Sequence, residues 1–151
     1  MLYALEKSLG FKINQTANKI NNKFNHLLQN YNIAPEQRAT LEIIKYEADV
    51  NQTKIASILA KDKTTISRTL ATLEKKGFIE KEQIDKRTNI IKLTVEGEKI
   101  LENSNHCVQD FRKDLFSNLN MEEANKLIEL LEKVSISIED TKWENQQIIY
   151  I

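Results

Sequence analysis

Residues 61–94 read KDKTTISRTLATLEKKGFIEKEQIDKRTNIIKLT, and this stretch predicts one helix followed directly by a β-hairpin. Its first half has an apolar face at the helical spacing of four and three residues, formed by Ile66, Leu70 and Leu73. Asp62 can accept hydrogen bonds from the amides of the first turn, and Gly77 is a natural C-terminal stop. We therefore expect a capped helix over about residues 63–76.

After the glycine the period of the sequence changes. Residues 78–83 and 89–94 are short β-prone runs, and in the second run Ile91 and Leu93 alternate with polar residues. The polar, charged residues 84–88 lie between the runs, as expected for the tip of a hairpin. The pattern predicts a two- or three-stranded β-wing directly after the helix.

Amphipathic segments flank this unit on both sides. Before it, we expect helices over about 2–30 and 35–47, the second opened by Pro35, and a short helix capped by Asn51. After it, helices are expected over about 95–119 and 121–138. The fold class is therefore mainly α with a small wing, a winged helix-turn-helix whose N- and C-terminal helices are surplus to DNA binding and need a partner surface.

Composition limits the function classes. A chain of 151 residues fits one domain, and its charge balances at 22 basic against 22 acidic residues. The balance is uneven, since residues 51–100 carry 11 Lys/Arg against 7 Asp/Glu while residues 121–151 carry 3 against 7. This asymmetry favours a cationic working surface in the middle of the chain. No spanning or leader segment is evident, so we expect a cytoplasmic protein with no membrane partner.

Several motifs in order make the pattern specific. They are Gln52, Ile55 and Ala56, then DKTTISR at 62–68, LEKKGFI at 73–79, Asp85 to Arg87, and Leu93, Thr94 and Gly97. Together they resemble the multiple-antibiotic-resistance-regulator (MarR) family. The resemblance implies a homodimeric repressor that binds a pseudo-palindromic DNA operator and is released by a small aromatic effector. It also implies a single domain over 1–151, with a winged core at about 33–97 and dimerisation helices at about 1–32 and 98–151.

Candidate DNA-contacting residues follow from the side of the 63–76 helix that is turned away from its apolar face. They are Thr64, Thr65, Ser67 and Arg68 on the helix, Lys61 and Lys63 near its start, and Lys86 and Arg87 at the hairpin tip. An arginine can donate two hydrogen bonds to guanine, and lysines near a helix start can meet phosphates. The resemblance implies that Arg87 enters the minor groove or binds its phosphates and that Asp85 orients Arg87. The alternative interpretation is a solvated, charged surface.

Other functions receive less support from the sequence. An enzyme is not expected, because three glycines and two isolated histidines offer neither a phosphate loop nor a nucleophile with its base. No cofactor is expected, and His26, His106 and Cys107 are too few for a zinc site. A winged-helix module for protein contacts and a redox-responsive regulator using Cys107 stay open as alternatives. Residues suited by type and location to line an effector site are Phe11, Phe24, His26, Tyr31 and Tyr46, although aromatic residues at helical spacing more often form core.

Overall fold

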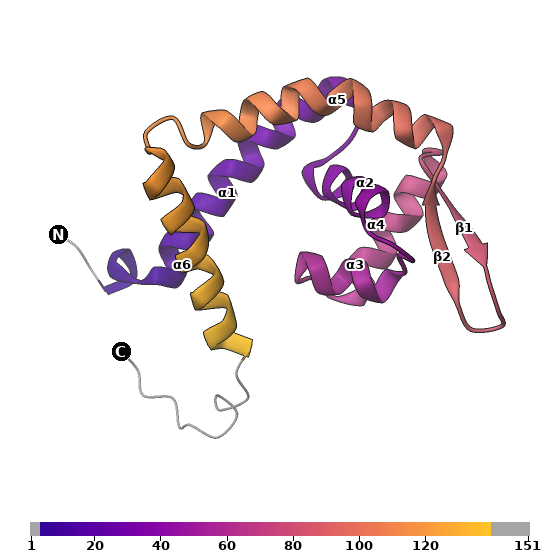
Figure 1. Ribbon diagram of the computed structural model, residues 1–151, viewed down its shortest axis with the longest axis horizontal. Coiled ribbons are helices and arrows are strands. Elements are labelled where there is room, and N and C mark those ends of the chain that lie inside the picture. The colour runs from indigo at the N-terminus through magenta and orange to yellow at the C-terminus, as the bar shows by residue number, and fades with distance from the viewer. Residues whose placement is uncertain (1–3, 140–151) are drawn as a thin grey trace. The chain divides into compact units, whose positions relative to one another are not determined.

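The computed structural model describes residues 4–139 (Figure 1). They divide after Gln109 into two compact units. The elements in chain order are a 3-10 helix Ala4–Lys7, α1 Leu9–Leu28, a 3-10 helix Gln29–Tyr31, α2 Pro35–Tyr46, α3 Gln52–Leu59, α4 Lys63–Lys75, β1 Ile79–Gln83, β2 Asn89–Leu93, α5 Val95–Asp114 and α6 Met121–Glu139. This order confirms the predicted fold class of a mainly helical chain with a β-wing.

Helix α4 supplies three side chains to the centre of the core of the first unit. Ile66, Leu70 and Leu73 are fully buried, as their spacing predicted. Complete burial of one such aliphatic side chain contributes about 1.5–3 kcal/mol. The cluster that surrounds them comprises Leu41, Ile44, Val50, Ile55, Ala56, Ile79, Ile91 and Leu101. The position of α4 is therefore set by contacts from α2, α3, the strands and α5 together.

Both helices of the helix-turn-helix begin at the predicted caps. Asn51 Oδ1 accepts from the Lys54 amide at 2.8 Å, and Asp62 Oδ1 accepts from the Thr65 amide at 2.7 Å. Each cap satisfies an amide that has no partner inside its helix. Between the helices Ala60 adopts a positive φ of 52°, which reverses the chain within a short turn.

The wing is one antiparallel hairpin with a continuous register from Ile79 opposite Leu93 to Gln83 opposite Asn89. Within residues 4–139 the sheet has two strands, so the smaller of the two predicted sizes is observed. The chain before α3 still touches it, because the Ile91 amide donates to the Val50 carbonyl at 2.9 Å. This single hydrogen bond joins the segment before α3 to β2 without forming a third strand in the described part of the chain.

The base of the wing is tightly packed against the start of α5. The Thr94 amide donates to the Phe78 carbonyl at 3.1 Å, and the Thr94 hydroxyl donates to the Gly77 carbonyl while accepting from the Gly97 amide. A Cβ atom added to Gly97 would lie 2.1 Å from the Phe78 carbonyl oxygen. Gly77 itself has a φ of 79°, consistent with its predicted role as a helix stop.

Two predicted helix boundaries were wrong. The single helix expected over residues 2–30 is interrupted at Ser8, whose hydroxyl accepts from the Phe11 amide at 3.5 Å and so starts α1 there. Residues 1–3 lie outside the described part. The helix expected over 95–119 ends at Asp114, and residues 115–118 form turns. After Asp114 the helical hydrogen bonds give way to tighter ones, since the Phe116 amide donates to the Lys113 carbonyl at 3.0 Å. A reciprocal cap then starts α6: Asn120 Oδ1 accepts from the Glu123 amide at 2.8 Å while Glu123 Oε1 accepts from the Asn120 amide at 3.1 Å.

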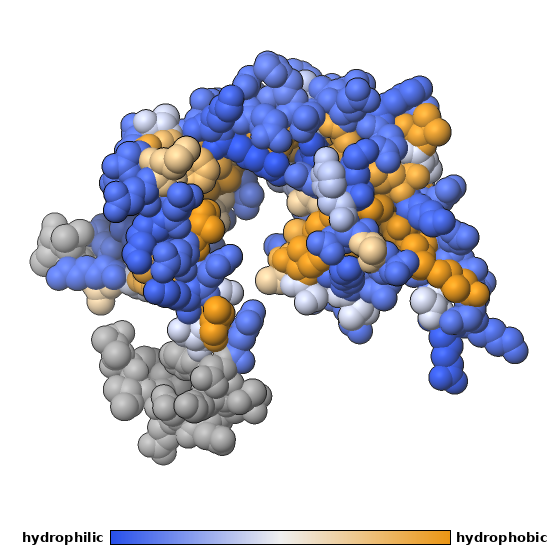
Figure 2. Space-filling view, viewed as in Figure 1, coloured by the Kyte–Doolittle hydropathy of each residue, from blue (hydrophilic) through white to orange (hydrophobic). Residues whose placement is uncertain are grey.

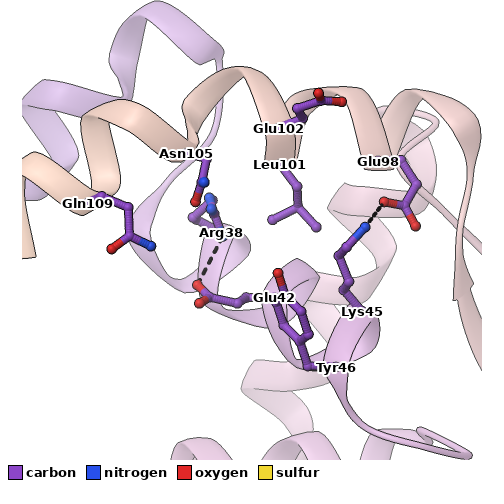
Figure 3. Close-up of a pocket in the computed structure, with 9 residues that line it drawn as sticks. All are labelled: Arg38, Glu42, Lys45, Tyr46, Glu98, Leu101, Glu102, Asn105 and Gln109. Atoms are coloured by element: carbon purple, nitrogen blue, oxygen red, sulfur yellow. Dashed lines mark hydrogen bonds and ion pairs between the residues drawn. The ribbon is translucent and has the colours of Figure 1, made fainter.

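A buried guanidinium joins α2 to α5 inside the first unit (Figure 3). Arg38 is 3% exposed; its Nε donates to Ser104 Oγ at 3.0 Å, and its Nη1 donates to Glu42 Oε2 at 3.0 Å. Lys45 and Glu98 form a further ion pair across the same two helices. The charged side chains of the two ion pairs, Arg38, Glu42, Lys45 and Glu98, line a polar pocket of about 260 Å³. The charge of Arg38 is compensated by its partners, so the contact fixes α5 on α2.

Helix α6 belongs to the second unit and has no buried residue. Its apolar side chains were expected to face inward, yet Leu127 is 44% exposed and Leu131 is 40% exposed. Figure 2 shows hydrophobic side chains along this helix. Across residues 4–139, no helix combines the length and apolar composition that a membrane crossing requires.

Candidate nucleic-acid interface

The solvent side of α4 presents the predicted reading residues. Thr64, Ser67 and Arg68 are exposed, on the side opposite the buried anchors. Within residues 4–139 no carboxylate lies within ion-pair distance of Arg68. Its guanidinium therefore retains its hydrogen-bond donors for a base edge or a phosphate.

Thr65 is placed differently from its neighbours. It is half-buried, and its hydroxyl donates to Asp62 Oδ2 at 3.1 Å while its amide donates to Asp62 Oδ1. The donor of this side chain is thus used by the helix cap. Thr65 can still offer its oxygen as an acceptor and its methyl group as an apolar contact.

The two lysines that flank Asp62 lie in contrasting surroundings. Lys63 is exposed, and its carbonyl accepts a 2.9 Å hydrogen bond from the Gln52 side chain. Lys61 Nζ lies 3.7 Å from Glu36 Oε2 at the first turn of α2. Gln52 was not predicted as a site residue, although it stands first in the motif series; here it ties the start of α3 to the start of α4.

The tip of the wing is shaped by its own backbone. The Ile84 amide donates to the Thr88 carbonyl at 2.9 Å, and Asp85 Oδ1 accepts from the Arg87 amide at 2.8 Å. That second hydrogen bond holds the pKa of Asp85 below its ordinary value. Asp85 therefore contacts the backbone of Arg87. Lys86 and Arg87 are exposed, and Figure 2 shows hydrophilic side chains projecting beyond the hairpin.

A polar hollow of about 270 Å³ lies between the wing and the helix-turn-helix. Its lining residues are Asn51, Gln52, Thr53, Leu70, Lys81, Arg87, Thr88, Asn89 and Ile91. The arrangement joins Arg87 to the start of α3 and adds Lys81 and Thr53, which sequence reasoning missed. The alternation along β1 places Lys81 on one side of the strand, but only the folded hairpin shows that this side faces α3.

Residues considered for sensing are dispersed. Phe24 lines a groove of about 520 Å³ to which α1, α2 and the end of α3 contribute, and Tyr46 lines the pocket of Figure 3. Phe11, His26 and Tyr31 line neither hollow. Cys107 is half-buried in α5, with its Sγ 3.9 Å from the Leu27 carbonyl oxygen.

The cap of α4 makes a testable prediction about pH. Hydrogen bonds from Thr65 lower the pKa of Asp62 below its ordinary value, so the ionised cap stabilises the fold above the unfolded-state pKa. This contribution is lost as the pH falls through the lower, folded-state pKa, that is, below about pH 4. We expect the difference in unfolding free energy between wild type and Asp62→Asn to shrink in that range. Urea unfolding at successive pH values measures it, and a constant difference would contradict the assignment.

Comparison with known proteins agrees with this geometry. The family model "MarR family" matches residues 33–88. The HTH-type transcriptional regulator MgrA of Staphylococcus aureus is 30% identical over 144 residues, covering 91% of this chain and 95% of MgrA. A MarR/EmrR family regulator from Acinetobacter sp. ADP1 superposes with a TM-score of 0.86 at 27% identity, over 92% of this chain and all of that one. A mutant MarR from E. coli complexed with operator DNA superposes with a TM-score of 0.76 at 31% identity, over 83% of this chain and 92% of that one. The chain therefore belongs to the MarR family of HTH-type transcriptional regulators.

Proposed function

We propose that the protein is a sequence-specific regulator that binds double-stranded DNA as a homodimer on a pseudo-palindromic operator. The observation that carries the proposal is α4, whose one face is anchored by fully buried side chains while its other face presents Arg68 without a carboxylate partner among the described residues. The relative solved with operator DNA supports it. In this arrangement α4 enters the major groove and the wing reaches the flanking backbone.

Each predicted contact then has a distinct part. Arg68 donates two hydrogen bonds to a guanine, and Thr64 and Ser67 meet neighbouring base edges. Thr65 contributes through its methyl group and hydroxyl oxygen, since its hydroxyl proton is donated to Asp62. At the flank, Arg87 enters a narrow minor groove while the backbone positions of the tip are held by Asp85.

Lysines supply the sequence-independent part of binding. Lys63 and Lys86 are exposed and have no carboxylate within ion-pair distance in the described part of the chain. Their contacts with phosphate would position the protein without reading sequence. Lys61 also lies near the start of α4, where it could contact phosphate, but unlike Lys63 and Lys86 it has a carboxylate, that of Glu36, within ion-pair distance.

The dimer would form through the terminal helices, as the exposed apolar side chains of α6 indicate. We expect Leu131→Glu to shift the protein from dimer to monomer at equal concentration, because a charge would be buried in an apolar contact. Sedimentation measures the shift. Lys133→Glu is the control, since Lys133 lies on the polar side and pairs with Glu129 at 3.2 Å. A wild-type monomer, or dimers in both variants, would remove this face from the interface.

Repression released by a small aromatic effector completes the proposal. The groove to which α1, α2 and the end of α3 contribute has Phe24, Pro35, Ala39 and Leu59 among its lining residues, and these apolar side chains suit an aromatic ring. Bound DNA would keep polymerase from an overlapping promoter, and effector binding would lower operator affinity. Such a regulator acts where the DNA is, in the cytoplasm.

Selection from random duplexes at a stated salt concentration tests the proposed function. We expect enrichment of an inverted repeat whose half-sites lie about one helical turn apart, or a multiple of it. If no inverted repeat is enriched, the DNA-binding proposal is overturned. In that event a winged module for protein contacts becomes the better interpretation.

A further inference from the structure

We propose that Glu36 is a positioning residue that restrains Lys61 and thereby withholds one phosphate contact from DNA of arbitrary sequence. This inference rests on the proposed function, because it concerns how strongly the same surface binds DNA that lacks the operator. Glu36 belongs to α2, outside the helix that reads the bases, and none of the sequence motifs includes it.

The carboxylate of Glu36 makes two contacts with the helix-turn-helix. Its Oε1 accepts from the Thr69 hydroxyl of α4 at 2.7 Å, and its Oε2 lies 3.7 Å from Lys61 Nζ in the turn before α4. The Thr69 hydroxyl is close to the Thr65 carbonyl as well, at 3.1 Å. One acidic group therefore spans the α3–α4 turn and the middle of α4.

The backbone of Glu36 is fixed at the start of α2. It lies in the first turn, where the positive end of the helix dipole favours a carboxylate, and its main-chain carbonyl accepts from the Thr40 hydroxyl at 2.8 Å. The Glu36 side chain is 30% exposed, against 52% for Lys61. Because the carboxylate is the less exposed partner and is carried by the first turn of a helix, its charge restricts where the Lys61 ammonium lies.

Lys63 differs from Lys61 in having no such contact with a carboxylate among the described residues. Two residues further on, Lys63 is exposed without a carboxylate partner in the described part of the chain. Phosphate contacts raise affinity for every sequence alike, whereas base contacts discriminate between sequences. A restrained Lys61 therefore lowers nonspecific affinity and leaves discrimination to Arg68 and its neighbours.

A double-mutant cycle on the full-length protein isolates the effect. Glu36→Gln keeps an oxygen that can accept from Thr69 but removes the charge that attracts Lys61. For a duplex of random sequence, we expect Glu36→Gln to raise affinity about three- to fivefold at low salt. The slope of log affinity against log salt should steepen by about 0.9 per chain, the value for one added phosphate contact.

Two further variants separate restraint of Lys61 from other causes. In a Lys61→Met background, Glu36→Gln should leave the salt slope unchanged, because no lysine remains to be released. Thr69→Val removes the hydroxyl but keeps the side-chain shape and the Glu36 charge that attracts Lys61 through Oε2, so it should leave the slope at the wild-type value. Measurements of operator affinity alongside give the specificity ratio, which should fall in Glu36→Gln.

The outcomes are distinguishable. An unchanged slope in Glu36→Gln, with wild type binding its operator, overturns this inference alone. Restraint of Lys61 is also overturned if the steeper slope persists in the Lys61→Met background, which would make it a general charge effect, or if Thr69→Val reproduces it. Failure of the wild-type protein to bind any duplex overturns the proposed function together with this inference.

Discussion

Replacement of Gly97 by alanine is expected to destabilise the first unit by about 1–3 kcal/mol, the typical cost of forcing an extra carbon into a packed interior. The new Cβ would lie 2.1 Å from the Phe78 carbonyl oxygen and 3.0 Å from the carbonyl carbon. Both are backbone atoms, so relief requires movement of the chain at the base of the wing. That carbonyl accepts from the Thr94 amide, and movement would strain this hydrogen bond as well.

Gly10→Ala is the matched control for this prediction. Gly10 also lies in a helix, but its added Cβ would be 3.8 Å from the hydroxyl oxygen of the N-cap Ser8, an ordinary van der Waals distance. Alanine in a helix is favoured over glycine by up to about 1 kcal/mol, so this variant should be neutral or more stable. Urea unfolding at equal protein concentration compares the two. Equal midpoints would show that the wing base accommodates a methyl group.

Arg68→Ala is expected to cost about 1–3 kcal/mol of operator affinity, through loss of a bidentate base contact. The preference at one position in each half-site should relax, while preferences elsewhere persist. The side chain is exposed on the face opposite Ile66, Leu70 and Leu73, so the folded structure should be unaffected. Binding to a panel of single-substitution operators measures the effect.

Arg87→Ala provides the comparison, because it removes the same charge from the tip of the wing. We expect it to weaken binding more evenly across sequences, as a contact with phosphate or minor-groove shape would. If the operator panel gives Arg68→Ala the same profile as wild type, Arg68 does not read a base, and its assignment as the guanine contact is overturned.

Most of the fold could be predicted from short-range patterns in the sequence. Asp62 and Asn51 cap the helices at which they were expected, and Ile66, Leu70 and Leu73 are buried as their spacing predicted. Capping and periodicity depend on residues within one or two turns, so the sequence displays them directly. The same physics explains the error at the N-terminus, where the cap at Ser8 decided the start of α1 and Gly10 was accommodated inside it.

Contacts between distant segments set the limit of sequence reasoning about the site. Lys61 was chosen as a phosphate contact from its place before α4, but its neighbour Glu36 stands in another helix. Likewise, Thr65 was predicted to contact DNA from its place on the helix, but its hydroxyl donates its proton to Asp62, the cap of α4. Charge and spacing therefore indicated which side chains surround the DNA surface, and only the fold shows which already have a partner.

The closure of the wing tip has a consequence for how such regulators diversify. Two hydrogen bonds hold the loop: the Ile84 amide donates to the Thr88 carbonyl, and the Arg87 amide donates to Asp85 Oδ1. Neither bond uses the side chain of Lys86 or Arg87. Replacement of either side chain by any residue that keeps its backbone N–H therefore leaves these hydrogen bonds in place. Descendants of one gene could acquire new flanking-sequence preferences by such replacements while the helix that reads the operator stays intact.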